Sequence, residues 1–275
     1  MNKKIGFIGG GNMGQALIKG ILKRGIANPR DIIVSDLDRN KLRVVSCEMQ
    51  VVIAEDNREV IEKSDIIILA VKPKDIERVL KEISDYLQGL SASGSSPMVL
   101  SIAAGITTKY IEEHLGDDVP VVRVMPNTPA LIGAGIAAIS RGRFAGEEEE
   151  KIAEELFRGV GETVKVKEEL MDAVTGLSGS GPAYVFAVME SLVEAGVKEG
   201  LPYGLAQKLV IQTVLGAVKM AMETGEKLST LREMVTSPGG TTEAALGVFE
   251  ERNLRNILAE GVSAAVRRSE EMGKS

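Results

Sequence analysis

The chain has 275 residues, which is long enough for two ordinary domains and for a substantial core without cross-links. Its formal net charge is −6, with 33 basic and 39 acidic residues mixed along the chain, so we expect no surface for nucleic acid. The single cysteine, Cys47, excludes an intrachain disulfide and a cysteine-rich metal cluster, and it favours a reducing, cytoplasmic setting.

The N-terminal stretch, MNKKIGFIGG, combines two lysines with a short apolar run. Glycines interrupt that run and no cleavage signal follows it, so we expect mature protein and not a targeting segment. No stretch approaches the roughly 18 apolar residues that a membrane span needs, so no membrane association is expected.

From residue 4 to about residue 166, short apolar runs alternate with helical patterns. The runs are KIGFIGG, DIIVSD, DIIILAV, PMVLSIAAG, PVVRVMPN, AAIS and TVKV. Apolar runs of this length between helices are typical of a mainly parallel sheet that is covered on both faces. The stretch QGLSASGSSP at 88–97 predicts a flexible loop between two such units. We therefore predict an α/β fold in which residues 1–166 form a Rossmann-like, doubly wound domain.

Two polar segments in this half are expected to have only structural roles. The stretch at 146–157 places Glu147 to Glu150 in the first turn of a helix, where negative charge suits the helix dipole. His114 is the only histidine, and it lies at a polar helix end before Gly116, where a C-terminal capping role is expected.

After residue 167 the strand signal stops and helical patterns follow one another. Pro182 and Pro202 suit first helical turns, and Gly225 suits a helix end. The patterns PAYVFAVMESLVEAGVKEG and GLAQKLVIQTVLGAVKMAM are apolar on almost every side, and such helices must be buried on several sides. About 110 residues in a few helices cannot bury them all. We therefore predict that residues 167–275 form an all-helical dimerisation domain.

The segment IGFIGGGNMG contains Gly9-x-Gly11-x-x-Gly14 directly after an apolar strand and before a helix. In this setting the glycine pattern indicates a dinucleotide site. Gly9 permits the tight turn, Gly11 lets the backbone approach a pyrophosphate, and Gly14 lets the helix pack against the sheet. The helix N-terminus then faces the phosphates.

The choice between NAD and NADP stays open at this stage. The second strand ends at Asp36, where an acidic group would bond a ribose 2′-hydroxyl and repel a 2′-phosphate. Ser35, Arg39, Asn40 and Lys41 stand close enough in the sequence to receive that phosphate instead. Further on, LAVKP ends another strand at the ligand-binding edge, and Lys72 within it fits a ligand or a plain surface lysine equally.

The sequence offers few catalytic bases and no histidine pair or cysteine cluster for a metal. GLSGSGPAYVFAVM at 176–189 has the glycine pattern of hydroxyacid dehydrogenases, which place a lysine four residues after the last glycine and an asparagine four residues later. Those positions are Val185 and Met189. Because alcohol oxidation needs a base, that reaction is disfavoured. A substrate that arrives protonated, such as an iminium ion, needs only orientation and a hydride donor.

A last segment, TSPGGTTEA at 236–244, predicts a turn that leads into a helix N-terminus and points backbone amides outward. Such a turn fits either a connector or an anion site. Pro238 fixes the chain, and the glycines let it approach a ligand.

Six segments together resemble pyrroline-5-carboxylate reductase, the last enzyme of proline biosynthesis. They are TGLSGSGPAY, VKEGLP, TSPGGTTEAAL, IGFIGGGNMG, AVKP and RVMPNTP, and the resemblance covers essentially the whole chain. The resemblance implies reduction of the ring C=N bond of 1-pyrroline-5-carboxylate to L-proline by NADPH or NADH. It also implies a dimer of intertwined helical domains, often assembled into larger rings. Each active site would lie between the nucleotide domain of one chain and helices of its partner, which makes the helical domain a substrate-binding domain too.

The resemblance also implies site residues. The cofactor contacts would be Gly9, Gly10, Gly11, Asn12, Met13, Gly14, Ser35, Asn57, Ala70, Val71, Lys72 and Pro73, to which the strand-end position adds Asp36. The substrate would be held by Ser237, Gly239, Gly240, Thr241 and Thr242, with weaker candidates at Asn127 and Glu168. Thr242 would be the catalytic residue, bonded to the ring nitrogen, while the loop amides take the carboxylate. No metal is implied.

Some alternatives stay open. Ser237 and Thr241 fit ligands or helix-capping hydroxyls, and Asn127 and Glu168 fit turn or cap residues. Two other functions are a dehydrogenase for 3-hydroxy acids and a non-catalytic dinucleotide sensor. Val185 and Met189 oppose the first, and the intact Ser-Pro-Gly-Gly-Thr-Thr stretch opposes the second.

Overall fold

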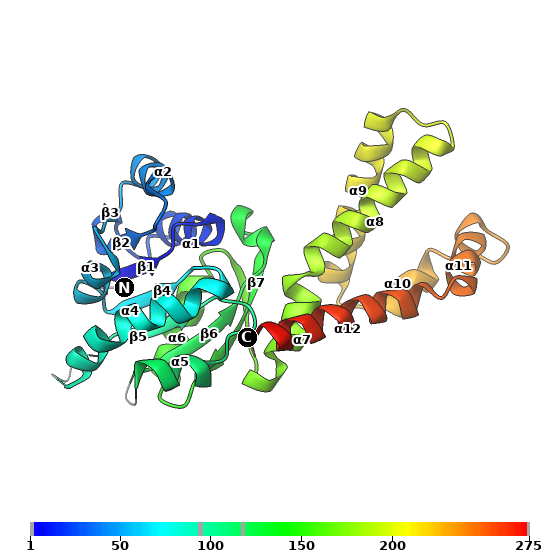
Figure 1. The fold of residues 1–275 in the computed structure, drawn as a ribbon. Helices are drawn as coiled ribbons and strands as arrows, with labels where there is room; N and C mark the ends of the chain where they lie inside the picture. Colours follow the sequence, from blue (N-terminus) through cyan, green and yellow to red (C-terminus); the bar gives the residue numbers. More distant parts are fainter. Residues whose placement is uncertain (1–2, 93–95, 117–118, 274–275) are drawn as a thin grey trace. The chain divides into compact units, whose positions relative to one another are not determined.

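A computed structural model describes residues 3–92, 96–116 and 119–273 (Figure 1). The chain divides into two compact units, Met1–Ser180 with Ala264–Ser275, and Gly181–Ser263. The last strand ends at Lys165. The domain boundary expected after residue 166 stays a prediction.

The first unit is built on an eight-stranded sheet with the order β3-β2-β1-β4-β5-β6-β7-β8. The strands are β1 (Ile5–Ile8), β2 (Ile32–Ser35), β3 (Val52–Ile53), β4 (Ile66–Leu69), β5 (Met98–Ser101), β6 (Val121–Met125), β7 (Gly135–Arg141) and β8 (Gly161–Lys165). Neighbouring strands run parallel, except that β6 and β7 are antiparallel. Because β2 and β4 flank β1, the winding changes direction there and three strand ends meet at one edge. The predicted doubly wound α/β fold is confirmed.

Helices cover both faces of this sheet. They are α1 (Asn12–Lys23), α2 (Arg39–Met49), α3 (Asn57–Glu62), α4 (Pro73–Ala92), α5 (Thr108–Leu115), α6 (Glu147–Phe157) and α7 (Met171–Val174). Alternate strand residues point to opposite faces, so Phe7 packs in a core with α1, α2 and α6, while Ile8 packs in a second core with α3, α4 and α5. Two buried faces explain why these strands are continuous apolar runs in the sequence.

Several local expectations can be compared with these elements. α6 begins at Glu147, and Gly116 caps α5 with His114 in its last turn, as expected. The loop expected at 88–97 is wrong for residues 88–92, because α4 continues through them. Residues 93–95 lie outside the described part of the chain. The two-residue strand β3 was not predicted, because it is too short to show a periodicity.

The second unit is helical. It contains α8 (Gly181–Lys198), α9 (Tyr203–Thr224), α10 (Leu228–Met234), α11 (Thr241–Glu251) and the start of α12 (Leu254–Met272), whose last residues belong to the first unit. α8 and α9 lie side by side as a helical hairpin in which Gly196 faces Ala206 (Figure 1). Among residues 181–263, all of which the structure describes, only Val193 and Ala206 are buried. The apolar helix faces that we expected to be buried are therefore exposed in a single chain.

α9 corrects one expectation. By length and composition alone it could cross a membrane, whereas no such stretch was expected from the sequence. Its residues are hardly buried within the chain. A helix that a second copy of the chain covers passes the same test.

Candidate functional site

The turn between β1 and α1 has two glycines that no other residue could replace without strain. Gly9 has a φ of +110°, and a Cβ there would lie 2.6 Å from the carbonyl oxygen of Ala70. A Cβ on Gly14 would lie 2.7 Å from the carbonyl oxygen of Gly9. The roles expected for these two glycines, a tight turn and close helix packing, therefore follow from the structure.

Gly11 is different, because a Cβ on it would meet no atom within 4 Å. It is the N-cap of α1 and provides no side-chain cap, so the first amides of that helix are left open. A side chain here would project into free space in front of the helix. This is the geometry that a pyrophosphate needs in order to approach the backbone.

Asp36, at the end of β2, holds this turn in place. Its Oδ2 accepts a hydrogen bond from the amide of Gly10 at 2.8 Å, and its Oδ1 accepts one from the amide of Asp38 at 2.8 Å. Lys41 Nζ lies 3.6 Å from Oδ1, and the Asp36 side chain is 11% exposed. Both carboxylate oxygens are thus already bonded to the protein itself.

A cavity of about 400 Å³ opens in front of this turn, at the carboxyl ends of β1, β2 and β4. Of the predicted cofactor residues, the structure brings Gly9, Gly11, Ser35, Asp36, Asn57, Ala70, Val71 and Lys72 to its wall. Gly10, Asn12, Met13, Gly14 and Pro73 lie in the same turns and helix starts but do not line it. This is the edge at which ligands of doubly wound sheets bind.

Several charged residues of the cavity wall were not predicted, among them three from α4 that are spaced four residues apart. Lys74, Arg78 and Glu82 line it from the first half of α4. Ser35 Oγ donates to Asn57 Oδ1 at 2.6 Å, and Asn57 Nδ2 donates to Glu82 Oε2 at 3.0 Å. The spacing of four residues between these charges, directly after the AVKP segment, was the signal that could have revealed them.

The second candidate site, the turn before α11, lies in the helical unit. Ser237 and Gly240 close it, with the Gly240 amide donating to the Ser237 carbonyl at 3.0 Å. Pro238 and Gly239 are its central residues, and Gly239 has a φ of +71°. This is the pattern of a type II turn, which needs glycine at the third position.

α11 starts directly after this turn with Gly240 as its N-cap and no side-chain cap. Thr241 and Thr242 occupy its first two positions. Among the described residues, the amides of Thr241, Thr242 and Glu243 have no hydrogen-bond acceptor. The carboxylate of Glu243 accepts a hydrogen bond from the Gly239 amide at 2.7 Å.

Asn127 and Glu168 are engaged elsewhere in the first unit. Asn127 Oδ1 accepts from the Ile136 amide at 3.0 Å, and its Nδ2 donates to the Ser178 carbonyl at 3.3 Å. Glu168 Oε1 accepts from Arg123 Nη1 at 3.0 Å and from the Thr108 amide at 3.1 Å. These contacts tie loops and helix starts together.

Arg123 was not singled out from the sequence, although its side chain is only 2% exposed. Its second carboxylate partner is Asp172, at 3.5 Å, which also accepts a hydrogen bond from Ser269 Oγ at 2.6 Å. A buried charge of this kind needs partners, and Glu168 and Asp172 supply them. Ser269 brings the last turn of α12 into the same cluster.

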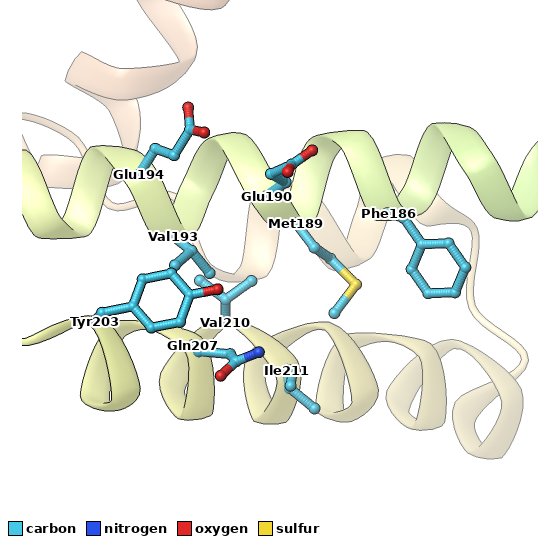
Figure 2. Close-up of a pocket in the computed structure, with 9 residues that line it drawn as sticks. All are labelled: Phe186, Met189, Glu190, Val193, Glu194, Tyr203, Gln207, Val210 and Ile211. Atoms are coloured by element: carbon cyan, nitrogen blue, oxygen red, sulfur yellow. The ribbon is translucent and has the colours of Figure 1, made fainter.

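The helical unit also has a groove of about 460 Å³ between α8 and α9. Figure 2 shows its lining, which is Phe186, Met189, Glu190, Val193 and Glu194 from α8, and Tyr203, Gln207, Val210 and Ile211 from α9. Phe186 is 65% exposed and Tyr203 is 62% exposed. Large apolar side chains that line an open groove indicate a surface for another chain, in contrast to the polar cavity of the first unit.

Comparisons with known proteins agree with both units. A family described as pyrroline-5-carboxylate reductase dimerisation matches residues 168–272, and one described as NADP oxidoreductase, coenzyme F420-dependent, matches residues 4–105. The pyrroline-5-carboxylate reductase of Methanosarcina acetivorans is 43% identical over 99% of both chains. That of Escherichia coli K12 is 38% identical over 100% of both chains.

Solved structures that resemble this chain include further pyrroline-5-carboxylate reductases. The pyrroline-5-carboxylate reductase of Coxiella burnetii has a TM-score of 0.90 at 39% identity and covers 100% of both chains. The enzyme of Plasmodium falciparum, with NADP bound, has a TM-score of 0.88 at 33% identity and covers 99% of this chain and 98% of its own.

The doubly wound sheet, the glycine turn and the cavity beside it define an NAD(P)-dependent oxidoreductase. The match to NADP-dependent oxidoreductases over residues 4–105 supports this class. With full-length relatives at about 40% identity, the chain belongs to the pyrroline-5-carboxylate reductase family.

Proposed function

We propose that this chain carries out the reaction of its family with the Ser237–Thr242 turn as its substrate site. The chain reduces the ring C=N bond of 1-pyrroline-5-carboxylate to L-proline, the last step of proline biosynthesis. The observation that carries the site assignment is the uncapped start of α11, which follows a glycine turn and places Thr242 at the second helical position. Such a helix start is an anion site with a hydroxyl beside it.

The first unit fits a nicotinamide dinucleotide, which supplies the hydride when bound. The open side of Gly11 and the uncapped start of α1 suit its pyrophosphate. Lys41, Lys72, Lys74 and Arg78 bring positive charge to a cavity wall that also holds acidic residues, namely Asp36, Asp38, Glu55, Asp56, Asp75 and Glu82. We propose that the predicted cofactor residues Gly9 to Gly14, Ser35, Asn57 and Ala70 to Pro73 contact it here.

In the substrate site, the amides of Thr241, Thr242 and Glu243 would receive the substrate carboxylate. The Thr242 hydroxyl would then lie at the ring nitrogen, where it positions the C=N bond and stabilises the nitrogen as positive charge is lost. Much of the rate would come from orientation of the ring against the hydride donor. Asn127 and Glu168 would act indirectly, because the Asn127 amide group and Oε1 of Glu168 already hold loops of the first unit.

Asp36 bears on the choice of cofactor. Its two oxygens each accept a hydrogen bond, from the amides of Gly10 and Asp38, so part of its capacity to bind a ribose hydroxyl is already used. Lys41 lies beside it and could neutralise a 2′-phosphate. We therefore propose that the enzyme prefers NADPH to NADH.

The assembly is a homo-oligomer formed through the helical domain. We propose that the basic unit is a dimer in which a second copy covers the exposed faces of α8 and α9, including the groove in Figure 2. Larger rings of dimers would bury further helix faces. The single, exposed Cys47 is compatible with a cytoplasmic enzyme.

A steady-state assay tests the substrate site. Thr242→Ala should lower kcat by about ten- to a hundredfold with 1-pyrroline-5-carboxylate and NADPH, because it removes a hydrogen bond used in the transition state. Thr242→Ser, the matched control, keeps the hydroxyl and should retain most of the activity. The affinity for NADPH, measured by calorimetric titration, should stay unchanged in both variants.

Wild-type kinetics in Thr242→Ala would remove Thr242 from the mechanism. The wild-type protein provides the wider test with NADPH and NADH in parallel. No cofactor oxidation with 1-pyrroline-5-carboxylate, combined with turnover of 3-hydroxy acids, would overturn the reaction itself. No turnover of either substrate would favour a dinucleotide sensor.

A further inference from the structure

The hydrogen bond between Glu243 and Gly239 is unusual in its position. A glutamate at the third position of a helix commonly accepts a hydrogen bond from the amide of the N-cap residue. α6 follows this rule, because Glu149 accepts from the amide of its N-cap, Gly146, at 2.7 Å. At α11 the glutamate occupies the same helical position but reaches one residue further back, to Gly239.

The shift has a local cause. The amide of the N-cap residue Gly240 already donates to the Ser237 carbonyl and closes the turn. The next free amide along the chain is that of Gly239, and Glu243 takes it. One carboxylate therefore links the middle of the glycine turn to the first turn of the helix.

Little else in the chain holds this turn. A Cβ on Gly239 would meet no atom within 4 Å, and Ser237, Pro238 and Gly239 are all exposed. Two adjacent glycines also give the segment more backbone freedom than other residues would. Pro238, the hydrogen bond from Gly240 to Ser237 and the bond to Glu243 are what fix it.

We propose that Glu243 is a positioning residue for the substrate turn, a role that rests on the proposed function of that turn. Its carboxylate fixes the Gly239 amide to the first turn of α11, directly beside the amides of Thr241, Thr242 and Glu243 itself, which we propose receive the substrate carboxylate. The Thr242 hydroxyl is held at a fixed distance from those amides. A displacement of about 1 Å in such a group is enough to lower a rate strongly.

The test compares Glu243→Ala, Glu243→Gln and a matched control in the full-length enzyme with 1-pyrroline-5-carboxylate and NADPH. Glu243→Ala should lower kcat about tenfold, the effect expected when one charge-assisted hydrogen bond that orders the site is lost. Glu243→Gln keeps an oxygen that accepts from Gly239 and should recover kcat to within about twofold of the wild type. Binding of NADPH should be unchanged in both variants.

The matched control is Glu149→Ala, which removes a hydrogen bond of the same kind and length from α6. It should leave kcat unchanged even if it lowers the melting temperature as much as Glu243→Ala does. The comparison of the two variants distinguishes an effect of Glu243 on the position of the site from a general loss of stability.

Two results would overturn the proposal. One is a wild-type kcat in Glu243→Ala, and the other is a Glu243→Gln variant as impaired as Glu243→Ala. Measured alongside, Thr242→Ala distinguishes the two levels of inference. If Thr242→Ala is impaired and Glu243→Ala is not, only the role of Glu243 fails, whereas wild-type kinetics in both variants would remove the turn from the active site.

Discussion

The two glycine turns of this chain have the same local design but different surroundings. Each leads into a helix that a glycine caps without a side chain, and in each a carboxylate accepts a hydrogen bond from a glycine amide, Asp36 from Gly10 and Glu243 from Gly239. The first turn is enclosed by neighbouring strand ends, and the second meets nothing beyond its own segment. Neighbouring strand ends therefore support the first turn, whereas the second turn, which we propose binds the substrate, depends on hydrogen bonds within its own segment.

The largest difference is expected when a methyl group is added to each turn. Gly9→Ala places a Cβ against the Ala70 carbonyl at a φ of +110°, and should lower the free energy of unfolding by about 3 kcal/mol. Gly239→Ala meets no neighbour, so only its φ of +71° is unfavourable, at a cost of about 1 kcal/mol. Urea unfolding monitored by circular dichroism measures both. Equal losses would show that the second turn is as enclosed as the first.

A smaller effect is expected at the carboxylate of the first turn. Asp36→Ala releases the amides of Gly10 and Asp38, and should weaken binding of both NADP and NAD about tenfold. Asp36→Asn keeps one acceptor oxygen and serves as the control. If Asp36 instead reads the ribose, its removal would weaken only NAD and strengthen NADP. Calorimetric titration with the two nucleotides decides between these outcomes.

The smallest effect on stability is expected at Glu112, which lies in the first unit. Burial raises the pKa of this carboxyl above its ordinary value of 4.5, and hydrogen bonds from the amides of Arg143 and Phe144 only partly oppose that rise. Because the folded state then holds the proton more tightly than the unfolded chain, ionised Glu112 lowers stability above its folded pKa. This cost disappears as the pH falls below the unfolded value.

Glu112→Gln should therefore stabilise the protein at pH 7 by less than about 1 kcal/mol, because solvent screens a partly exposed group. The advantage should vanish near pH 4, and thermal unfolding at both pH values measures it. Glutamine keeps an acceptor for the Arg143 amide, so the geometry is retained. A variant that is less stable than the wild type at pH 7 would contradict this account.

Local patterns in the sequence predicted the sheet and the nucleotide turn, because both depend on short-range rules. Continuous apolar runs such as IIIL indicate strands buried on two faces, and Gly9, Gly11 and Gly14 mark a turn whose backbone geometry only glycine allows. The turn at Ser237–Gly240 could be predicted for the same reason, since its proline and glycine determine the turn type locally. The resemblance to a known family then supplied the substrate.

Features that depend on residues far apart in the chain could not be predicted from the sequence. Nothing near Arg123 in the sequence indicates that Glu168 and Asp172 will neutralise it in the core. The two hydrogen bonds that Asp36 accepts from Gly10 and Asp38, and the one that Glu243 accepts from Gly239, could be seen only in the structure. Each of them depends on the path of the backbone. The length of α4 beyond residue 88 was also missed, since serine and glycine suggested a loop where helix packing prevails.

The hydrogen bond from Ser269 to Asp172 has a consequence for synthesis on the ribosome. Asp172 lies near the end of the first stretch of the nucleotide unit, Met1–Ser180, yet its partner emerges only after the whole helical unit has been translated. Most strands can pair while translation continues, but the Arg123 cluster stays incomplete until the last turn of α12 arrives. The nucleotide unit is therefore translated first but completed last.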